Sequence, residues 1–87
     1  MYSKKVTILN SAGLHARPAV MFVEEASKFK SNITVTNGYK DASSRSILSI
    51  MALGASKGTE ITIMAEGEDE ETAVTALVNL INSNFNE

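Results

Sequence analysis

The sequence contains no cysteine and only one histidine, His15, and both scarcities narrow its chemistry. Without cysteine there is no disulfide, no thiolate metal ligand and no thiol catalysis, and the composition suits the cytoplasm. A single imidazole also argues against a transition-metal centre, because such centres combine several nitrogen or sulfur ligands. We therefore expect neither a metal nor a cofactor.

Long apolar runs are missing as well. No stretch approaches the roughly 18 continuous apolar residues that a membrane span requires. Residues 1–10 are too poor in apolar side chains for a secretory leader. The chain has 87 residues, of which 44% are hydrophobic and 21% charged. These values predict one small soluble domain over residues 1–87, with no insertion into a membrane.

Charge is distributed unevenly along the chain. Residues 1–58 carry all eight basic residues and three acidic ones, whereas residues 59–87 carry seven acidic residues and no basic one. The net charge of −2 disfavours a nucleic-acid partner, which normally requires a basic domain. The basic first part could steer an acidic protein partner or hold a phosphoryl group. Alternatively, the basic segment 1–58 and the acidic segment 59–87 do not form separate charged faces in the folded chain.

Hydrophobic spacing predicts the order strand, helix, strand, strand, helix, strand, helix. The expected strands lie near 5–9, 32–36, from 39 onward and at 60–65, and the expected helices near 15–28, 46–53 and from 68 onward. Asn37-Gly38 predicts a two-residue hairpin turn with both residues at positive φ. In so short a chain the helices must cover one face of a mostly antiparallel sheet, which is an α+β fold.

The segment Gly13-Leu-His-Ala-Arg-Pro18 indicates the chemistry of the chain. Pro18 fits only the first turn of a helix, so His15 falls at or just before the helix start, with Ala16 and Arg17 as the opening residues. The free amides of a first turn, together with the helix dipole, form an anion site. The dipole and Arg17 both favour a neutral imidazole, whose ring nitrogen can attack a phosphoryl donor.

Two interpretations of His15 remain open at this point. In the first, it holds a phosphoryl group whose oxygens meet the amides of Ala16 and Arg17 and the Arg17 guanidinium. No carboxylate lies nearby in the sequence to activate water, which favours passing the group on over hydrolysing it. In the second, His15 has no chemical role and Arg17 is merely a solvated surface residue.

Ser46 is predicted to be the N-cap of the short second helix. After it, Ile47, Leu48 and Met51 form either an apolar surface patch or part of the core, and their exposure decides between the two. Ile50 is expected in the core.

The segment around His15 resembles the phosphorylation motif of the HPr family, the histidine-containing phosphocarriers of the bacterial phosphoenolpyruvate:sugar phosphotransferase system. The resemblance extends over essentially the whole chain and includes residues 46–54 and 65–69. It implies a βαββαβα open-faced β-sandwich, with a four-stranded antiparallel sheet covered on one face by helices. It also implies a carrier and not an enzyme, with a pros-phosphohistidine at His15 and Arg17 stabilising the phosphate.

The same resemblance implies the partners. Phosphorylated enzyme I would supply the phosphoryl group and sugar-specific enzyme II A components would receive it. In Gram-positive relatives an ATP-dependent kinase phosphorylates the serine that corresponds to Ser46. An HPr kinase/phosphorylase and a catabolite repressor are therefore expected partners, with Ile47, Leu48 and Met51 as docking residues. We expect a monomer.

Other functions on the same fold are a regulatory binding module of the catabolite-repression type and a nitrogen-related phosphotransfer carrier. Related modules that no longer transfer phosphate lack the active histidine, whereas this chain has His15. Ser43 and Ser44 depart from the family pattern and add hydroxyl groups near Ser46.

Overall fold

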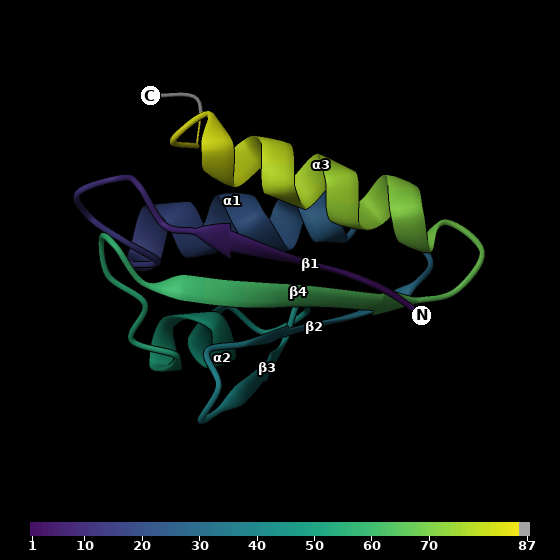
Figure 1. The fold of residues 1–87 in the computed structure, drawn as a ribbon, viewed down its shortest axis with the longest axis horizontal. Helices are drawn as coiled ribbons and strands as arrows, with labels where there is room; N and C mark the ends of the chain where they lie inside the picture. Colours follow the sequence, from purple (N-terminus) through teal and green to yellow (C-terminus); the bar gives the residue numbers. More distant parts are fainter. Residues whose placement is uncertain (86–87) are drawn as a thin grey trace.

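The computed structural model describes residues 1–85 and has the element order that the sequence predicts (Figure 1). The strands are β1 (Tyr2–Thr7), β2 (Asn32–Thr36), β3 (Asp41–Ser43) and β4 (Glu60–Glu66), and the helices are α1 (Ala16–Ala26), α2 (Ile47–Ala52) and α3 (Glu70–Asn82). The predicted α+β class with βαββαβα order is thus confirmed. None of the helices in this part of the chain is long and apolar enough to cross a membrane.

The four strands form one sheet in the order β1-β4-β2-β3, and every neighbouring pair is antiparallel. The register pairs Val6 with Ile61 and Val35 with Ile63, so these buried side chains share one face. The next position on β4, Thr62, is only half-buried, as expected for alternation in a sheet covered on one side. Helix α3 contacts β1 and β4 and packs beside α1 (Figure 1), which confirms the open-faced sandwich.

The core combines the buried strand positions with the apolar stripes of the helices. Its largest fully buried side chains are Phe22, Phe85, Ile8, Ile50, Ile61, Ile63, Leu77, Ile81, Val35 and Val74. The prediction that Ile50 is a core residue is confirmed. Phe85, beyond the end of α3, was not expected there, because it follows a polar segment and continues no periodic stripe.

The connection between β2 and β3 corrects the predicted two-residue turn. Residues 37–40 form it, and Gly38 (φ +95°) has a positive φ whereas Asn37 does not. The Asn37 side-chain oxygen accepts hydrogen bonds from the amides of Tyr39 and Lys40, both at 2.8 Å. Because that side chain supplies the acceptor of the turn, the Asn37 backbone does not need the left-handed region. Helix α1 is also shorter than predicted, since it ends at Ala26.

Asp69 connects two segments that are far apart in the sequence. Its carboxylate makes no cap bond to α3, although Asp69 is the N-cap residue. Instead it accepts hydrogen bonds from the Lys30 amide at 2.9 Å, from the Ser31 amide at 3.0 Å and from the Ser31 hydroxyl. The Ser31 hydroxyl and then the Lys30 amide lower the pKa of Asp69 below its ordinary value. The start of α3 is therefore tied to the loop that follows α1.

Candidate functional site

His15 is the N-cap residue of α1, as predicted. Its backbone is extended (φ −79°, ψ −167°), and its carbonyl accepts the first helical hydrogen bond, from the Ala19 amide at 2.9 Å. Its side chain makes no cap hydrogen bond and is exposed. The imidazole is consequently free to meet a molecule that approaches this end of the helix.

The first turn of α1 provides the other parts of the predicted anion site. Ala16 and Arg17 are its first two residues and both are exposed, whereas Pro18 is buried and has no amide hydrogen. The turn contains no acidic residue that would compensate the positive end of the helix dipole. Within residues 1–85 no ion pair engages the Arg17 guanidinium, so it is available to pair with an anion.

The loop before His15 is anchored to the loop between α2 and β4. Gly13 has φ +62°, and a Cβ atom there would lie 2.4 Å from the Ala55 carbonyl oxygen. The amide of the buried Leu14 donates to that same oxygen at 2.8 Å. Asn10, also buried, donates from its side chain to the Gly13 carbonyl at 2.9 Å. The sequence gives no indication of this role for Asn10, because a polar residue in a predicted turn carries no signal that it is buried.

Ser46 and the apolar residues after it lie on α2, which contacts α1. Ser46 caps α2 as predicted, since its hydroxyl accepts from the Ser49 amide at 3.2 Å. Exposure decides the question left open by the sequence: Ile47 and Leu48 are 37% and 79% exposed and therefore belong to the surface. Met51 is half-buried and packs against the core.

Helix α1 adds one more exposed apolar side chain on the surface near the site. Val20 lies one turn after Arg17 and is 37% exposed. The sequence could have indicated this exposure, because Val20 does not share the helical spacing of the buried residues Ala19 and Phe22. The structure thus presents apolar surface on two neighbouring helices, one of which has His15 as its N-cap.

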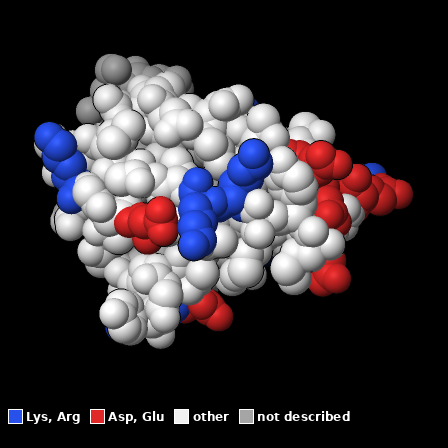
Figure 2. Space-filling view, viewed as in Figure 1, with Lys and Arg blue, Asp and Glu red and all other residues white. Residues whose placement is uncertain are grey.

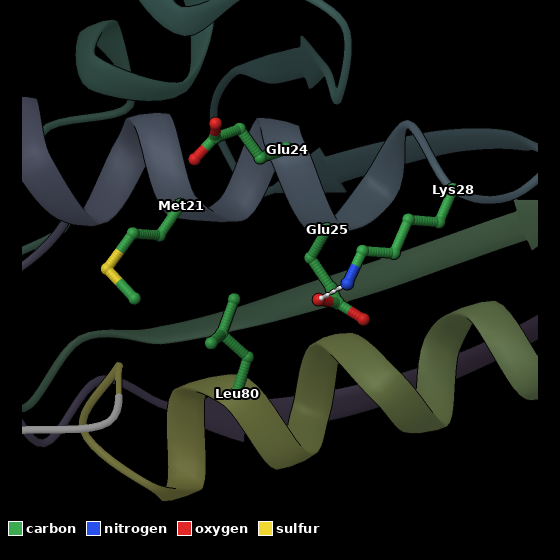
Figure 3. Close-up of a pocket in the computed structure, with 5 residues that line it drawn as sticks. All are labelled: Met21, Glu24, Glu25, Lys28 and Leu80. Carbon is green, nitrogen blue, oxygen red and sulfur yellow. Dashed lines mark hydrogen bonds and ion pairs between the residues drawn. The ribbon is translucent and has the colours of Figure 1, made fainter.

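A hollow between α1 and α3 lies apart from these residues (Figure 3). It is lined by Met21, Glu24, Glu25, Lys28 and Leu80. Met21 and Leu80 project into the space between the helices, and the Lys28 ammonium pairs with the Glu25 carboxylate at 3.0 Å. Neither His15 nor Arg17 lines this hollow, so it is not part of the predicted site.

The acidic residues of the second half of the chain gather mainly in one place. Five of them lie where β4 leads into α3, namely Glu66, Glu68, Asp69, Glu70 and Glu71. They form the acidic surface on the right of Figure 2, whereas the loop leading into α1 lies at the opposite end of the sandwich (Figure 1). Half of the ten acidic residues of the chain therefore lie away from His15.

Comparisons with known proteins give matches over nearly the whole chain. The family model described as the PTS HPr component phosphorylation site matches residues 2–83. Phosphocarrier protein HPr of Haemophilus influenzae is 54% identical over 81 residues, which are 93% of this chain and 95% of that protein. The crystal structure of HPr-C-His from Thermoanaerobacter tengcongensis is 49% identical with a TM-score of 0.96, covering 100% of this chain and 98% of that one. An HPr dimer structure from the same organism is also 49% identical, with a TM-score of 0.79 and 100% of both chains covered.

Proposed function

The chain belongs to the HPr family, the phosphocarriers of the phosphotransferase system, and on that premise we propose that His15 is the residue that carries the phosphoryl group. One observation carries the proposal. An exposed imidazole, unused in helix capping, stands at the N-terminus of α1 beside the amides of Ala16 and Arg17. Those amides have no acceptor within the helix and can bind an anion.

The proposed reaction is a transfer between nucleophiles. The Nδ1 atom of His15 attacks the phosphorus atom, and the bond between phosphorus and the donor breaks as the new phosphorus–nitrogen bond forms. The phosphoryl oxygens then accept hydrogen bonds from the amides of Ala16 and Arg17 and from the Arg17 guanidinium. The resulting phosphohistidine is the pros form expected for the family.

The positions of the carboxylates on α1 support holding the group over hydrolysing it. The helix has no acidic residue in its first turn. Its two carboxylates, Glu24 and Glu25, lie in its last turn, and Glu25 is already paired with Lys28. A general base for water is therefore not supplied by this helix, and the phosphoryl group can persist until an acceptor arrives.

We further propose enzyme I as the donor and sugar-specific enzyme II A components as the acceptors, in the cytoplasm. Both would dock on the exposed apolar surface of α1 and α2, formed by Val20, Ile47, Leu48 and the half-buried Met51. A phosphate on Ser46, placed by an HPr kinase/phosphorylase, would put about two negative charges beside this surface and alter docking, including that of a catabolite repressor. The proposed transferring form is a single-domain monomer.

The test is incubation of the chain with phosphoenolpyruvate and catalytic enzyme I, followed by mass spectrometry. We expect one acid-labile phosphate, absent in His15→Ala. An unmodified mass in the unaltered chain would overturn the proposal.

Arg17 is tested in the same assay. Arg17→Ala should slow transfer by roughly tenfold or more, the worth of a hydrogen bond to a charged group. Because Arg17 is exposed, the thermal unfolding midpoint of the Arg17→Ala protein should hardly change. Lys30→Ala, which removes an exposed cationic side chain beside Asp69 at the other end of the sandwich, is the matched control. Parallel losses of transfer and stability in Arg17→Ala would show a structural role instead.

A further inference from the structure

The direction of the His15 ring depends on the backbone that leads to it, because the side chain makes no cap hydrogen bond. The peptide unit between Gly13 and Leu14 comes just before it, and both of its polar groups are held. The Leu14 amide donates to the Ala55 carbonyl at 2.8 Å, and the Gly13 carbonyl accepts from the Asn10 side chain at 2.9 Å. This peptide plane can therefore rotate only if one of the two bonds breaks.

Asn10 supplies the bond on one side of that plane. Asn10 is only 4% exposed, and its backbone carbonyl accepts a hydrogen bond from the Gly13 amide at 3.1 Å. The turn from Asn10 to Gly13 is thus closed twice, once by the backbone and once by the side chain. An alanine could keep the backbone bond but would have no N–H group to offer the Gly13 carbonyl.

The other end of the Asn10 amide is unusual. Its side-chain oxygen is buried and has no hydrogen-bond partner among residues 1–85. Burying an unpaired acceptor lowers stability, so the fold keeps this side chain at a cost. The cost is understandable if the side chain serves the site, because deviations from good packing and pairing collect where function requires them.

We propose that Asn10 is a positioning residue for phosphoryl transfer. By holding the Gly13–Leu14 peptide against Ala55, it sets the direction in which the His15 imidazole leaves the backbone, and it does not touch the phosphoryl group itself. The inference rests on the proposed function of His15. Transfer between two proteins requires the attacking nitrogen in line with the breaking bond, and small misplacements cost large factors in rate.

The experiment measures initial rates of phosphorylation by enzyme I at varied concentrations of the full chain, for Asn10→Ala and Asn10→Asp. Asn10→Asp keeps the size of the side chain but replaces the donor with an acceptor at neutral pH. The matched control is Asn37→Ala, which also removes a bond from an asparagine side chain to a backbone carbonyl, here that of Leu53 at 2.8 Å. Each variant is assayed at a temperature where its NMR spectrum shows a folded protein, with sucrose added as required.

A misplaced His15 imidazole and a partly unfolded chain change different kinetic constants of phosphorylation. Mispositioning lowers kcat, and we expect a fall of about tenfold in both Asn10 variants with KM nearly unchanged. Partial unfolding only reduces the concentration of competent carrier, so it raises the apparent KM and leaves kcat intact, as expected at most for Asn37→Ala. An unaltered kcat in either Asn10 variant would overturn the positioning role while leaving the carrier function standing. Failure of the unaltered chain to accept phosphate would instead overturn the proposed function.

Discussion

Gly13 is a position where the surrounding backbone leaves no space for a side chain. It has φ +62°, and an added Cβ would lie 2.4 Å from the Ala55 oxygen and 2.8 Å from Ser56 Cα. Gly13→Ala therefore combines left-handed strain with a collision against backbone atoms. We expect a loss of about 3 kcal/mol in the free energy of unfolding, measured by urea denaturation.

Gly54→Ala is the matched control for this prediction. Gly54 has φ +65°, and an added Cβ would meet nothing within 4 Å. Only left-handed strain applies there, so the expected loss is about 1 kcal/mol. Equal losses in the two variants would contradict the close approach of the loop before His15 to the α2–β4 loop.

Helix α2 has only six residues and depends on its cap for stability. Ser46→Ala removes the bond from the Ser49 amide and should lower the free energy of unfolding by about 1 kcal/mol. Its kcat for phosphoryl transfer should not change, because the cap does not touch His15. Chemical denaturation and the enzyme I assay measure the two effects separately.

Ser46→Asp should have the opposite combination of effects. Aspartate is a good N-cap, so stability is retained. Its charge next to Ile47 and Leu48, however, should slow transfer severalfold by disfavouring docking of an acidic partner. A transfer rate equal to that of the unaltered chain would count against Ser46 as a site of negative regulation.

The connection between Asp69 and the loop after α1 makes stability depend on pH. Hydrogen bonds from Ser31 and Lys30 lower the pKa of Asp69 in the folded protein. The stabilisation is therefore present above the unfolded pKa of about 4 and is lost as the pH falls through the lower folded pKa. At pH values below about 4 we expect the thermal unfolding midpoint to decrease. This decrease should be smaller in Asp69→Asn, which lacks the titrating carboxylate.

Glu68→Gln is the control, because it removes an exposed carboxylate of the same acidic surface. It should retain the acid sensitivity of the unaltered chain. If Asp69→Asn and Glu68→Gln have identical pH profiles, general charge repulsion and not the bonds to residues 30–31 determines the acid response.

A domain of this size has little stability in reserve, of the order of 5–15 kcal/mol. Phe85 is 2% exposed and is among the largest fully buried side chains, although it lies beyond the last helix. Phe85→Ala should lower the free energy of unfolding by about 3 kcal/mol, measured by urea denaturation. Tyr39→Ala is the control, since Tyr39 is 95% exposed and its loss should change stability by less than about 0.5 kcal/mol.

The arrangement of charge over the molecule also bears on function. The two blocks of opposite charge in the sequence could have been mixed in space, but five carboxylates lie together where β4 leads into α3 (Figure 2). The start of α1, of which His15 is the N-cap, lies at the other end of the sandwich (Figure 1). A partner that approaches the exposed imidazole therefore does not meet these five carboxylates, which are half of the acidic residues of the chain.

The amino-acid sequence by itself determined the type and order of the seven elements, the cap of α2 and the position of His15 at the start of α1. These features depend on residues within a few positions of one another. Pro18 limits where a helix can begin, Ser46 bonds to an amide three residues later, and alternating or helical spacing specifies which side is apolar. Each of these signals is complete within one short segment.

Only the tertiary structure decided which polar groups are buried and what surrounds them. Asn10 is buried, Ser31 meets a carboxylate 38 residues away, and Phe85 enters the core from a polar segment. The same holds for exposure. Leu48 is an apolar residue just after the cap of α2, where the sequence allows either core or surface, and the structure places it at the surface. These outcomes depend on contacts between segments that are distant along the chain, and local propensities carry no information about which segments meet.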